Sequence, residues 1–553
     1  MEELHLMPLY RQTFLADNLP DAARMGSRLS CCWMVRNDCD FQWDADESHR
    51  RYVVLAISAD GEYVSTALPI REPVSPGDVA CFCGTIALPE RLCNLQLTAE
   101  LVHHNHTFFT AGGADKWRRE ISLVRNPFAA EDAEVAQALT ANYSYFLPAG
   151  GMVTRRDGGR WPVFAGRAYG ARVETTDGGE YIDYLMGWGS ALLGHGHERI
   201  AGAVQQELRN GVTVSLPHYG EVETGRDILA LFPNHQMVQF GKNGSDVCTL
   251  AVRMMRVHTG RKKILFWGYH GWQDWFTARL GFGQSGVADT EDLHAIIYGD
   301  ADGLEAYAAQ HANEIAGIIM EPGAAVIGPE GPIPELDAAY LRSLRATCDR
   351  HGFLLAFDEI YTGFRHPGGS AQAAAGVVPD ITLLGKGLAA GYPLGAMLTS
   401  RALFESTAGR VMYGPTYKGE RISLAACRAA LKIYRESDVP ARVSNFGLAL
   451  RREITSFDEA AELGLEFIGP PYRQMAVFRN GGPLLRKLRR MLLLQELLRR
   501  GVLSYKGLFL PSAAHGEREL EETVTRFHEA LITVLGAGNG PEVVQQLEIF
   551  PAY

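Results

Sequence analysis

Two patterns of apolar positions divide the chain near residue 125. In the first part, apolar residues alternate with polar ones, as at Val53, Leu55 and Ile57, and turn-forming clusters such as 75–78 separate these runs. Alternation with a period of two is typical of strands that are buried on one face. The pattern therefore predicts an antiparallel β-sandwich over residues 1–125.

From about residue 126 onward, short unbroken apolar runs alternate with helical patterns. The runs are Lys263–Trp267, Ala316–Met320, Phe353–Phe357 and Ile381–Leu384. Continuous apolar strands joined by helices predict an α/β unit with a mostly parallel sheet covered on both faces. Ligands of such sheets bind beyond the carboxyl ends of the strands. The residues that follow each run are therefore the first candidates for chemistry.

Composition and charge narrow the function classes. The 553 residues are 46% hydrophobic and 21% charged, which is typical of a globular protein. The net charge of −11 would repel a phosphate backbone, so we expect no nucleic-acid partner. The sequence starts without a signal-peptide pattern and has no run of about 18 apolar residues. Its nine cysteines lack paired Cys-x-x-Cys spacing, which favours reduced thiols. We expect a cytoplasmic protein without a membrane partner.

The first candidate site is the loop 240–246, which contains Asn243, Gly244 and Ser245 and precedes a helical pattern that stops at Gly260. The N-terminus of a helix presents unpaired backbone N–H groups and the positive end of the helix dipole, which suit a phosphate. An ordinary turn capped by a side chain explains the loop equally well when it is considered alone.

Two further candidates follow predicted strands. Asp358 and Glu359 come directly after one apolar run, and Lys386 lies between Gly385 and Gly387 after another. A carboxylate at the end of a buried strand is costly unless it pairs with a cation or a ligand. A lysine, a carboxylate and a phosphate loop are the groups that pyridoxal phosphate requires. The lysine forms a Schiff base, the carboxylate keeps the ring nitrogen protonated, and the loop anchors the phosphate.

With these motifs the chain resembles the class III (fold type I) pyridoxal-phosphate aminotransferases and is similar to glutamate-1-semialdehyde aminomutase. The resemblance extends from about Gly150 to about residue 535. The matching motifs lie at 178–184, 194–197, 241–246, 268–271, 358–365, 385–387 and 414–417.

The resemblance implies a fold type I unit over residues 126–553, preceded by the sandwich. Within it, residues from about 200 to 429 would form a large cofactor domain. Residues 126–199 together with 430–553 would form a small α+β domain. The leucine-rich stretch 484–500 has a basic face, which we interpret as a solvated face of the small domain rather than a membrane-binding segment.

The resemblance also implies roles for single residues. Lys386 would form the Schiff base and then act as the base that moves the proton. Asp358 would hold the ring nitrogen. Tyr269 would stack on one face of the ring with His270 nearby, and Ile360 would pack against the other face.

The same resemblance assigns the phosphate site. Gly244 and Ser245, in the loop that also contains Asn243, would hold the phosphate. Thr416 matches a threonine that the partner subunit contributes in this family, which implies a homodimer. The family often has Ser-Gly-Asn-Pro after this point, whereas the chain has Lys-Gly-Glu-Arg at 418–421, so the substrate side of the loop can differ.

The function implied is an aminotransferase that moves an amino group from a small-molecule donor to an aldehyde or ketone acceptor. A sugar or a secondary-metabolite intermediate is one candidate acceptor. An intramolecular aminomutase is the alternative within enzymes. A glycan-binding protein with an inactive aminotransferase-like domain is the alternative from another class. The last rests on segment 74–109, which resembles the immunoglobulin-like glycan-binding module of O-antigen ABC transporters; a sandwich that only packs against the larger unit explains the segment as well.

Some side chains allow two interpretations. Trp188 aligns with an aromatic residue that lines the substrate pocket in the family, but a core tryptophan is nearly as plausible. Arg365 could bind a substrate carboxylate, although we favour a structural partner such as Glu359 or a backbone carbonyl. His195 and His197 have the spacing of a metal pair, yet a buried turn is the better explanation because zinc needs three or four ligands. We therefore predict no metal.

Overall fold

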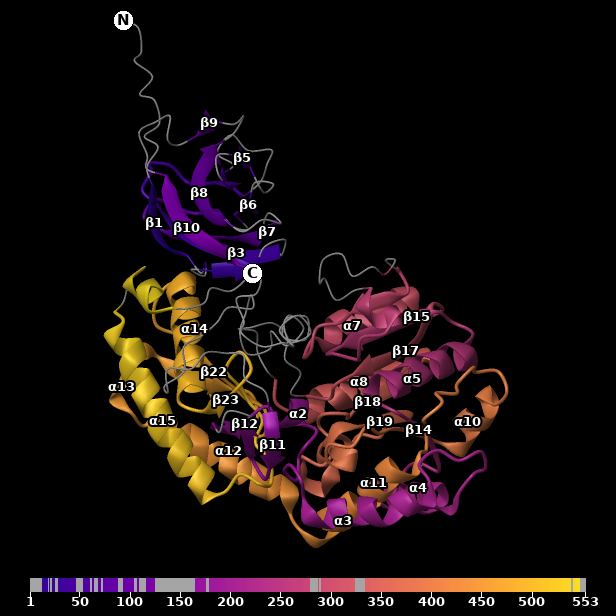
Figure 1. Ribbon diagram of the computed structural model, residues 1–553. Coiled ribbons are helices and arrows are strands. Elements are labelled where there is room, and N and C mark those ends of the chain that lie inside the picture. Colours follow the sequence, from indigo (N-terminus) through magenta and orange to yellow (C-terminus); the bar gives the residue numbers. More distant parts are fainter. Residues whose placement is uncertain are drawn as a thin grey trace, which may run out of the picture.

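A computed structural model describes strands and turns between residues 12 and 124, and then residues 165–175, 179–278, 287, 290–323, 334–538 and 541–547. The described strands form five sheets. Figure 1 shows the N-terminal strands at one end of the molecule and the helix-rich remainder below them. No helix among these residues is long and apolar enough to cross a membrane.

The N-terminal strands form two sheets that enclose their own core. One sheet has the order β1 (Gln12–Asp17), β3 (Arg28–Asn37), β7 (Val79–Ala87). The other contains β2 (Ala22–Arg24), β10 (Trp117–Val124), β8 (Cys93–His103), β4 (Val53–Ala59), β5 (Glu62–Tyr63), β6 (Leu68–Pro69) and β9 (Thr107–Phe108). Trp33, Trp43 and Phe82 are fully buried between them. The pairing is antiparallel as predicted, except that β2 pairs with β10 in parallel.

The sandwich packs against the C-terminal part of the chain. On β3, Trp33 and Val35 belong to the sandwich core, whereas Met34 points the other way and is buried in a cluster with leucines of α14 (Pro483–Arg499). Alternate residues of a strand face opposite sides, so one strand serves both contacts. This observation supports the packing interpretation of the sandwich, and the glycan-binding resemblance stays a prediction.

The large sheet confirms the predicted parallel architecture. Its order is β14 (Met237–Gly241), β20 (Gly395–Thr399), β19 (Ile381–Leu384), β18 (Leu354–Asp358), β17 (Ile315–Met320), β15 (Lys263–Trp267), β16 (Leu293–Ala295). All neighbours pair in parallel except those of β20, which runs antiparallel to both β14 and β19. The four apolar runs identified in the sequence form β19, β18, β17 and β15, which lie side by side in this sheet.

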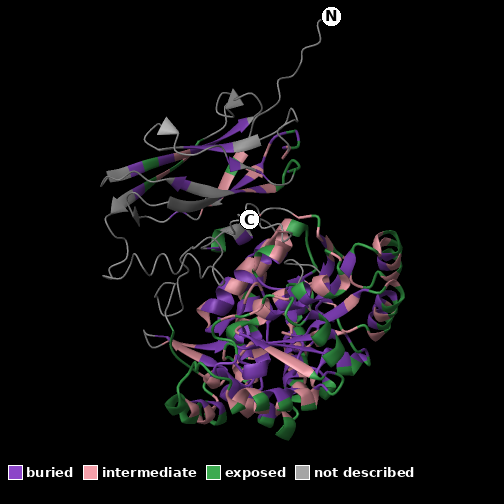
Figure 2. Ribbon diagram, turned by 90° about the vertical axis from the view of Figure 1, so that its right-hand side faces the viewer, coloured by how far each residue is buried: buried purple, intermediate pink, exposed green. Residues whose placement is uncertain are grey.

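Helices cover both faces of the large sheet. Ile319 of β17 packs in a cluster with α5 (Gly244–Thr259), while its neighbour Ile318 packs in a cluster with α7 (Ala301–His311) and α8 (Ala338–His351). Figure 2 shows the resulting distribution, with buried strands inside and exposed residues on the outer helices. Burial on both faces is why these strands lack polar alternation.

Smaller elements surround this sheet. The helices are α2 (Met186–Gly189), α3 (Glu198–Glu207), α4 (Tyr219–Leu231), α6 (Asp274–Thr277), α9 (Ala371–Ala375), α10 (Arg401–Thr407), α11 (Arg421–Glu436), α12 (Val439–Thr455), α13 (Asp458–Leu463) and α15 (Glu517–Gly536). The strands are β11 (Ala165–Tyr169), β12 (Arg172–Thr175), β13 (Glu180–Asp183), β21 (Leu465–Ile468), β22 (Gln474–Phe478), β23 (Val502–Leu503) and β24 (Leu508–Phe509). Short 3-10 turns occur at η3 (Leu208–Asn210), η4 (Pro367–Gly369), η5 (Lys386–Ala389) and η6 (Pro541–Gln546).

Segments from before and after the large sheet meet in one small sheet. Strand β13 pairs in parallel with β23, although more than 300 residues separate them. This contact supports our proposal that 126–199 and 430–553 form one small domain beside a large domain of about 200–429. Eight residues of α14 are buried, five of them leucines, and the assignment of that helix to the small domain stays a proposal.

Three buried histidines should make the fold sensitive to acid. Burial lowers the pKa of His235, His366 and His515 to about 4 each, below the unfolded value of about 6.5. The unfolded state therefore binds more protons as the pH falls below 6.5, and stability is lost progressively toward pH 4. We expect each histidine to lower the free energy of unfolding by on the order of 2 kcal/mol between pH 7 and pH 5. Urea unfolding at both pH values measures this loss, and His235→Gln should make the pH dependence shallower.

Candidate active site

Asp358 and Lys386 lie at the carboxyl edge of the large sheet. Asp358 is the last residue of β18 and pairs in register with Leu383 of the neighbouring strand β19. Lys386 follows β19 and begins the short turn η5 with a left-handed backbone, at φ 41°. Such a conformation in a residue other than glycine is uncommon and is concentrated at functional sites. The parallel register of two strands thus brings the two predicted residues to the same edge.

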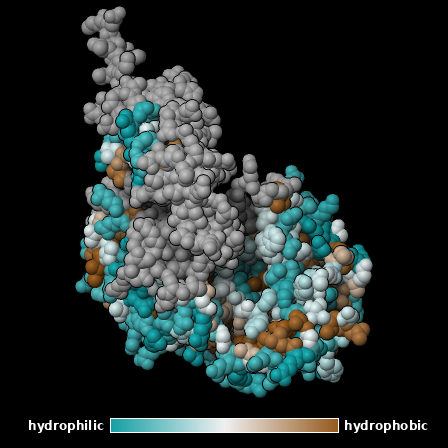
Figure 3. Space-filling view, in the orientation of Figure 1, coloured by the Kyte–Doolittle hydropathy of each residue, from teal (hydrophilic) through white to brown (hydrophobic). Residues whose placement is uncertain are grey.

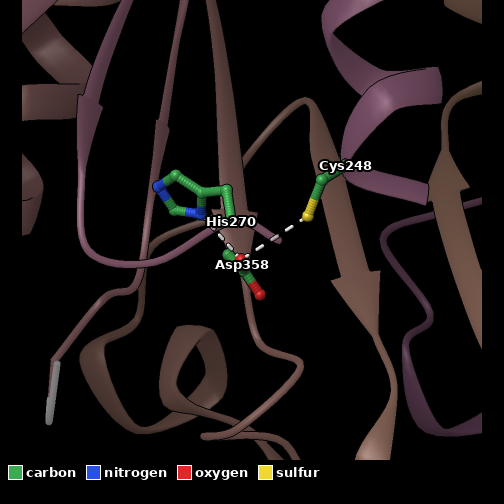
Figure 4. A group of neighbouring side chains, drawn as sticks. All are labelled: Cys248, His270 and Asp358. Atoms are coloured by element: carbon green, nitrogen blue, oxygen red, sulfur yellow. Dashed lines mark hydrogen bonds and ion pairs between the residues drawn. The ribbon is translucent and has the colours of Figure 1, made fainter. Parts of the chain in front are cut away.

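The carboxylate of Asp358 is buried and held by several donors. The imidazole of His270 lies with Nδ1 2.7 Å from Oδ2, and the backbone N–H of Ile360 donates to Oδ1 at 3.0 Å. The thiol of Cys248 donates to Oδ2 at 3.6 Å. Figure 4 shows the imidazole and the thiol converging on this carboxylate from different elements. These contacts fix the orientation of a carboxylate that is only 2% exposed.

Cys248, His270 and Asp358 also place one possible metal ligand each within 4.8 Å of one another. Hydrogen bonding to Asp358 explains this cluster without an ion, because a structural zinc site takes four ligands. Burial raises the pKa of the Cys248 thiol well above its usual range, and the nearby carboxylate of Asp358 raises it further. The sulfur therefore keeps its proton and acts as a hydrogen-bond donor.

The predicted phosphate loop forms the N-terminus of α5. Asn243 is the N-cap, and its side-chain Oδ1 accepts a hydrogen bond from the backbone N–H of Asp246 at 3.0 Å. The carboxylate of Asp246 accepts in return from the backbone N–H of Asn243 at 3.2 Å. The N–H groups of Gly244 and Ser245 lie in the first turn, where a helix offers no intrahelical acceptor. Such N–H groups at the positive end of a helix suit an anion.

Ile360 closes the space between the phosphate loop and Lys386. A Cβ at Gly244 would lie 2.7 Å from Cδ1 of Ile360, and one at Gly385 would lie 3.1 Å from its Cγ2. A larger residue at either position would therefore push against the side chain of Ile360. Tyr269 follows β15 at the same edge, and its residue is 52% exposed. The lysine, the buried carboxylate, the anion-binding turn and these flanking side chains fit pyridoxal phosphate.

An ion pair at the same edge was not predicted from the sequence. Glu321 follows β17, is 4% exposed, and accepts the backbone N–H of Tyr269 at 3.0 Å. Its other oxygen accepts from Nη1 of Arg473 at 2.9 Å. The rule that selected Asp358, a charged residue directly after an apolar strand, would also have selected Glu321. No local signal identifies Arg473, which lies 152 residues further along the chain.

Arginines surround the ring of Tyr361 beside Lys386. The guanidinium carbons of Arg365 and Arg473 lie 4.3 Å and 4.1 Å from its centroid, and Nζ of Lys386 lies 5.5 Å from it. Desolvation by the surrounding protein lowers the pKa of Lys386, and the charge of Arg473 lowers it further. Arg365 donates to the backbone carbonyls of Tyr361 and Gly189. The predicted backbone role of Arg365 is thus confirmed.

Trp188 and Thr416 are both exposed. Trp188 belongs to α2, which packs against η5. The centroid of its ring lies 4.7 Å from the centroid of the Tyr505 ring. At 38% exposure it is not a core tryptophan, so that alternative is wrong. Thr416 is exposed in a turn before α11, next to Tyr417, which is 58% exposed.

Comparison with known families decides the identity of this fold. The family described as Aminotransferase class-III matches residues 153–464. The chain belongs to this family. A glutamate-1-semialdehyde 2,1-aminomutase of Ignicoccus hospitalis is 32% identical over 67% of this chain and 92% of its own length. A 3-aminobutyryl-CoA aminotransferase of Cloacimonas acidaminovorans is 30% identical over 68% of this chain and 90% of its own.

Solved structures agree with the class III assignment. The FumI protein of Sphingopyxis sp. MTA144, in its PLP internal aldimine form, is 26% identical with a TM-score of 0.64, and the match covers 74% of this chain and 99% of FumI. A transaminase with PLP bound is 25% identical with a TM-score of 0.63, over 74% of this chain and all of its own. The class III chain is therefore a pyridoxal-phosphate-dependent enzyme of amino transfer.

Proposed function

We propose that this class III enzyme transfers an amino group from a small-molecule donor to an aldehyde or ketone acceptor through the groups at the edge of the large sheet. The observation that carries the proposal is the placement of Lys386 and Asp358 at neighbouring strand ends, with Gly244 and Gly385 both close to the side chain of Ile360. When bound there, pyridoxal phosphate supplies an electron-withdrawing ring that carries the amino group.

The residues of the chain take distinct parts in this transfer. The lowered pKa of Lys386 leaves more of its amine neutral near pH 7, so that Nζ can act as nucleophile and then take up and return a proton. Asp358, oriented by His270, holds a proton at the ring nitrogen. Tyr269 and Ile360 hold the ring between them, and Trp188 lines the substrate side.

The phosphate site in this proposal spans two subunits. Asn243 orders the turn, and Gly244 and Ser245 donate their N–H groups to the phosphate. Thr416 reaches the same phosphate from the partner subunit of a homodimer. Exposed apolar residues near this turn support an interface, and Figure 3 shows hydrophobic residues gathered on the face near α4 and α11. The exposed large apolar and aromatic residues of segments 208–222 and 412–417 are Leu208, Val212, Val214, Leu216, Tyr219, Val222, Met412 and Tyr417.

The immediate test is a donor screen with the cofactor-loaded protein and no acceptor. An aminotransferase should convert its cofactor to the amine form with one of the donors, and its visible absorption band should disappear; adding an acceptor should restore the band. The relative from Ignicoccus hospitalis is named as an aminomutase. An enzyme of that kind would instead complete turnover on one substrate without a separate donor. A protein that binds no cofactor would contradict the proposal and favour the glycan-binding alternative.

We also propose a cytoplasmic location. Support comes from five cysteines whose side chains the structure describes and which are free thiols. They are Cys39, Cys81, Cys248, Cys348 and Cys427.

A further inference from the structure

A nearly buried ion pair joins the phosphate loop to the turn that carries Thr416. Nζ of Lys242 lies 2.6 Å from Oε1 of Glu420 and donates to Oγ of Ser423 at 3.3 Å. The side chain of Glu420 is 5% exposed and that of Lys242 is 27% exposed. Lys242 directly precedes the N-cap of α5, so the pair connects the first turns of two helices, α5 and α11.

Glu420 is also the N-cap of α11. Its carboxylate accepts the backbone N–H groups of Ile422 at 2.8 Å and Ser423 at 3.0 Å. Burial alone would raise the pKa of Glu420, but the hydrogen bonds from Lys242 and Ser423 outweigh it and lower the pKa below its usual value. Glu420 is therefore an ionised and nearly buried carboxylate whose one close cation is Lys242 among the residues that the structure describes.

The other end of the turn is tied to α5 and to β14, the strand that precedes the phosphate loop. Arg253 of α5 donates to the backbone carbonyl of Met412 at 2.7 Å, and the hydroxyl of Tyr413 donates to the carbonyl of Phe240 in β14 at 2.7 Å. Segment 412–420 thus starts and ends on β14 and α5, whose junction is the phosphate loop. Its middle, with Thr416, is exposed.

The chain departs from its family at one member of this pair. Glu420 occupies the position where the family often has asparagine, in the motif that follows the threonine and tyrosine. A glutamate in a nearly buried position needs a cation, which Lys242 supplies from a segment 178 residues away. The substitution therefore links two loops of the site through charge.

We propose that Lys242 and Glu420 form a positioning pair that couples the two phosphate sites of the dimer. The pair holds the Thr416 turn against the phosphate loop of its own subunit, while Thr416 serves the phosphate of the partner subunit. Retention of the cofactor in one subunit then depends on the ion pair of the other. This inference rests on the proposed function, in which Thr416 crosses the interface.

The different exposures of the two side chains predict an order of effects. Lys242→Met leaves the nearly buried carboxylate of Glu420 without its cation, which is the costly case. Glu420→Gln leaves Lys242, which can turn toward solvent, and keeps an acceptor for the α11 cap. The double variant removes both charges. We expect Lys242→Met to be the most harmful of the three and the double variant to recover part of the loss.

The test follows release of pyridoxal phosphate from the holoenzyme after dilution into a scavenger of free cofactor. We expect Lys242→Met to release it about tenfold faster, which corresponds to about 1.4 kcal/mol. Thr416→Ala should also release it faster. In the Thr416→Ala background, Lys242→Met should add little, because the pair acts through Thr416. Additive effects of the two substitutions would overturn the coupling.

Matched controls separate this role from general stability. Lys263→Met breaks a pair of similar length with Glu314, 2.7 Å, near the amino end of β15, and should leave cofactor release unchanged. The carboxylate of Glu314 is 55% exposed, so this control tests the loss of a lysine and its ion pair away from the site. If Lys242→Met does not fold, Glu420→Gln takes its place, with a smaller increase in release that Thr416→Ala again masks. A wild type without cofactor would contradict the proposed function. A wild type with cofactor, whose Lys242→Met variant folds and releases it at the wild-type rate, would contradict this inference alone.

Discussion

Lys386→Ala should abolish amino transfer and remove the visible absorption band of the bound cofactor. Lys386 is the amine at the end of β19, and its lowered pKa favours the neutral form that can bond to a carbonyl carbon and move a proton. Loss of acid–base action alone costs about 10²–10⁴-fold in rate, and loss of the nucleophile adds to it. We therefore expect a decrease of at least about 10³-fold. Initial rates with the identified donor and an absorption spectrum measure both effects.

Lys386→Arg is the control for this prediction. Arginine keeps a positive charge near Tyr361 but stays protonated, so it can neither form the covalent bond nor accept a proton. It should be as inactive as the alanine variant. Substantial activity in Lys386→Arg would show that the charge at this position suffices, and would contradict the role assigned to Lys386.

Asp358→Asn should have the second-largest effect. The amide keeps the shape of the side chain but only one acceptor oxygen, whereas His270 and the backbone N–H of Ile360 contact different oxygens of Asp358. It also removes the negative charge that would hold a proton on the ring nitrogen. Loss of one preorganised electrostatic partner costs about 10²–10³-fold in kcat. We expect a decrease of that size, measured as turnover per bound cofactor. The unfolding midpoint should also fall, because one buried donor loses its acceptor.

The adjacent Glu359 offers a matched control. Its buried carboxylate accepts the backbone N–H groups of Ala371 at 2.7 Å and Gln372 at 2.9 Å, and so caps α9. Glu359→Gln should lower the unfolding midpoint while turnover per bound cofactor stays near that of the wild type. If the two variants had the same profile, Asp358 would be structural as well.

The positions of Lys386 and Asp358 were accessible to sequence reasoning because their signals are local. An apolar run of four to six residues defines a buried strand by itself, and parallel strands bring their carboxyl ends to one edge. The cap at Asn243 and the start of α5 are equally local, since both depend on residues within one helical turn. Resemblance to the family then assigned roles to these positions.

Contacts between distant segments were not accessible in this way. His270 meets Asp358 across 88 positions, and Lys242 meets Glu420 across 178. Neither pair produces a recognisable pattern in the sequence, because each side chain alone is compatible with an exposed loop. Arg473 likewise becomes part of the site only when β22 is placed beside the large sheet.

By itself, therefore, the sequence determined the strands of the large sheet, the helix after the phosphate loop and the edge where Lys386 and Asp358 stand. Tertiary structure decided which charges meet there and on which surface the sandwich rests. Periodicity and capping arise from neighbours along the chain, whereas ion pairs and the burial of Met34 arise from packing between elements whose relative placement no local pattern encodes.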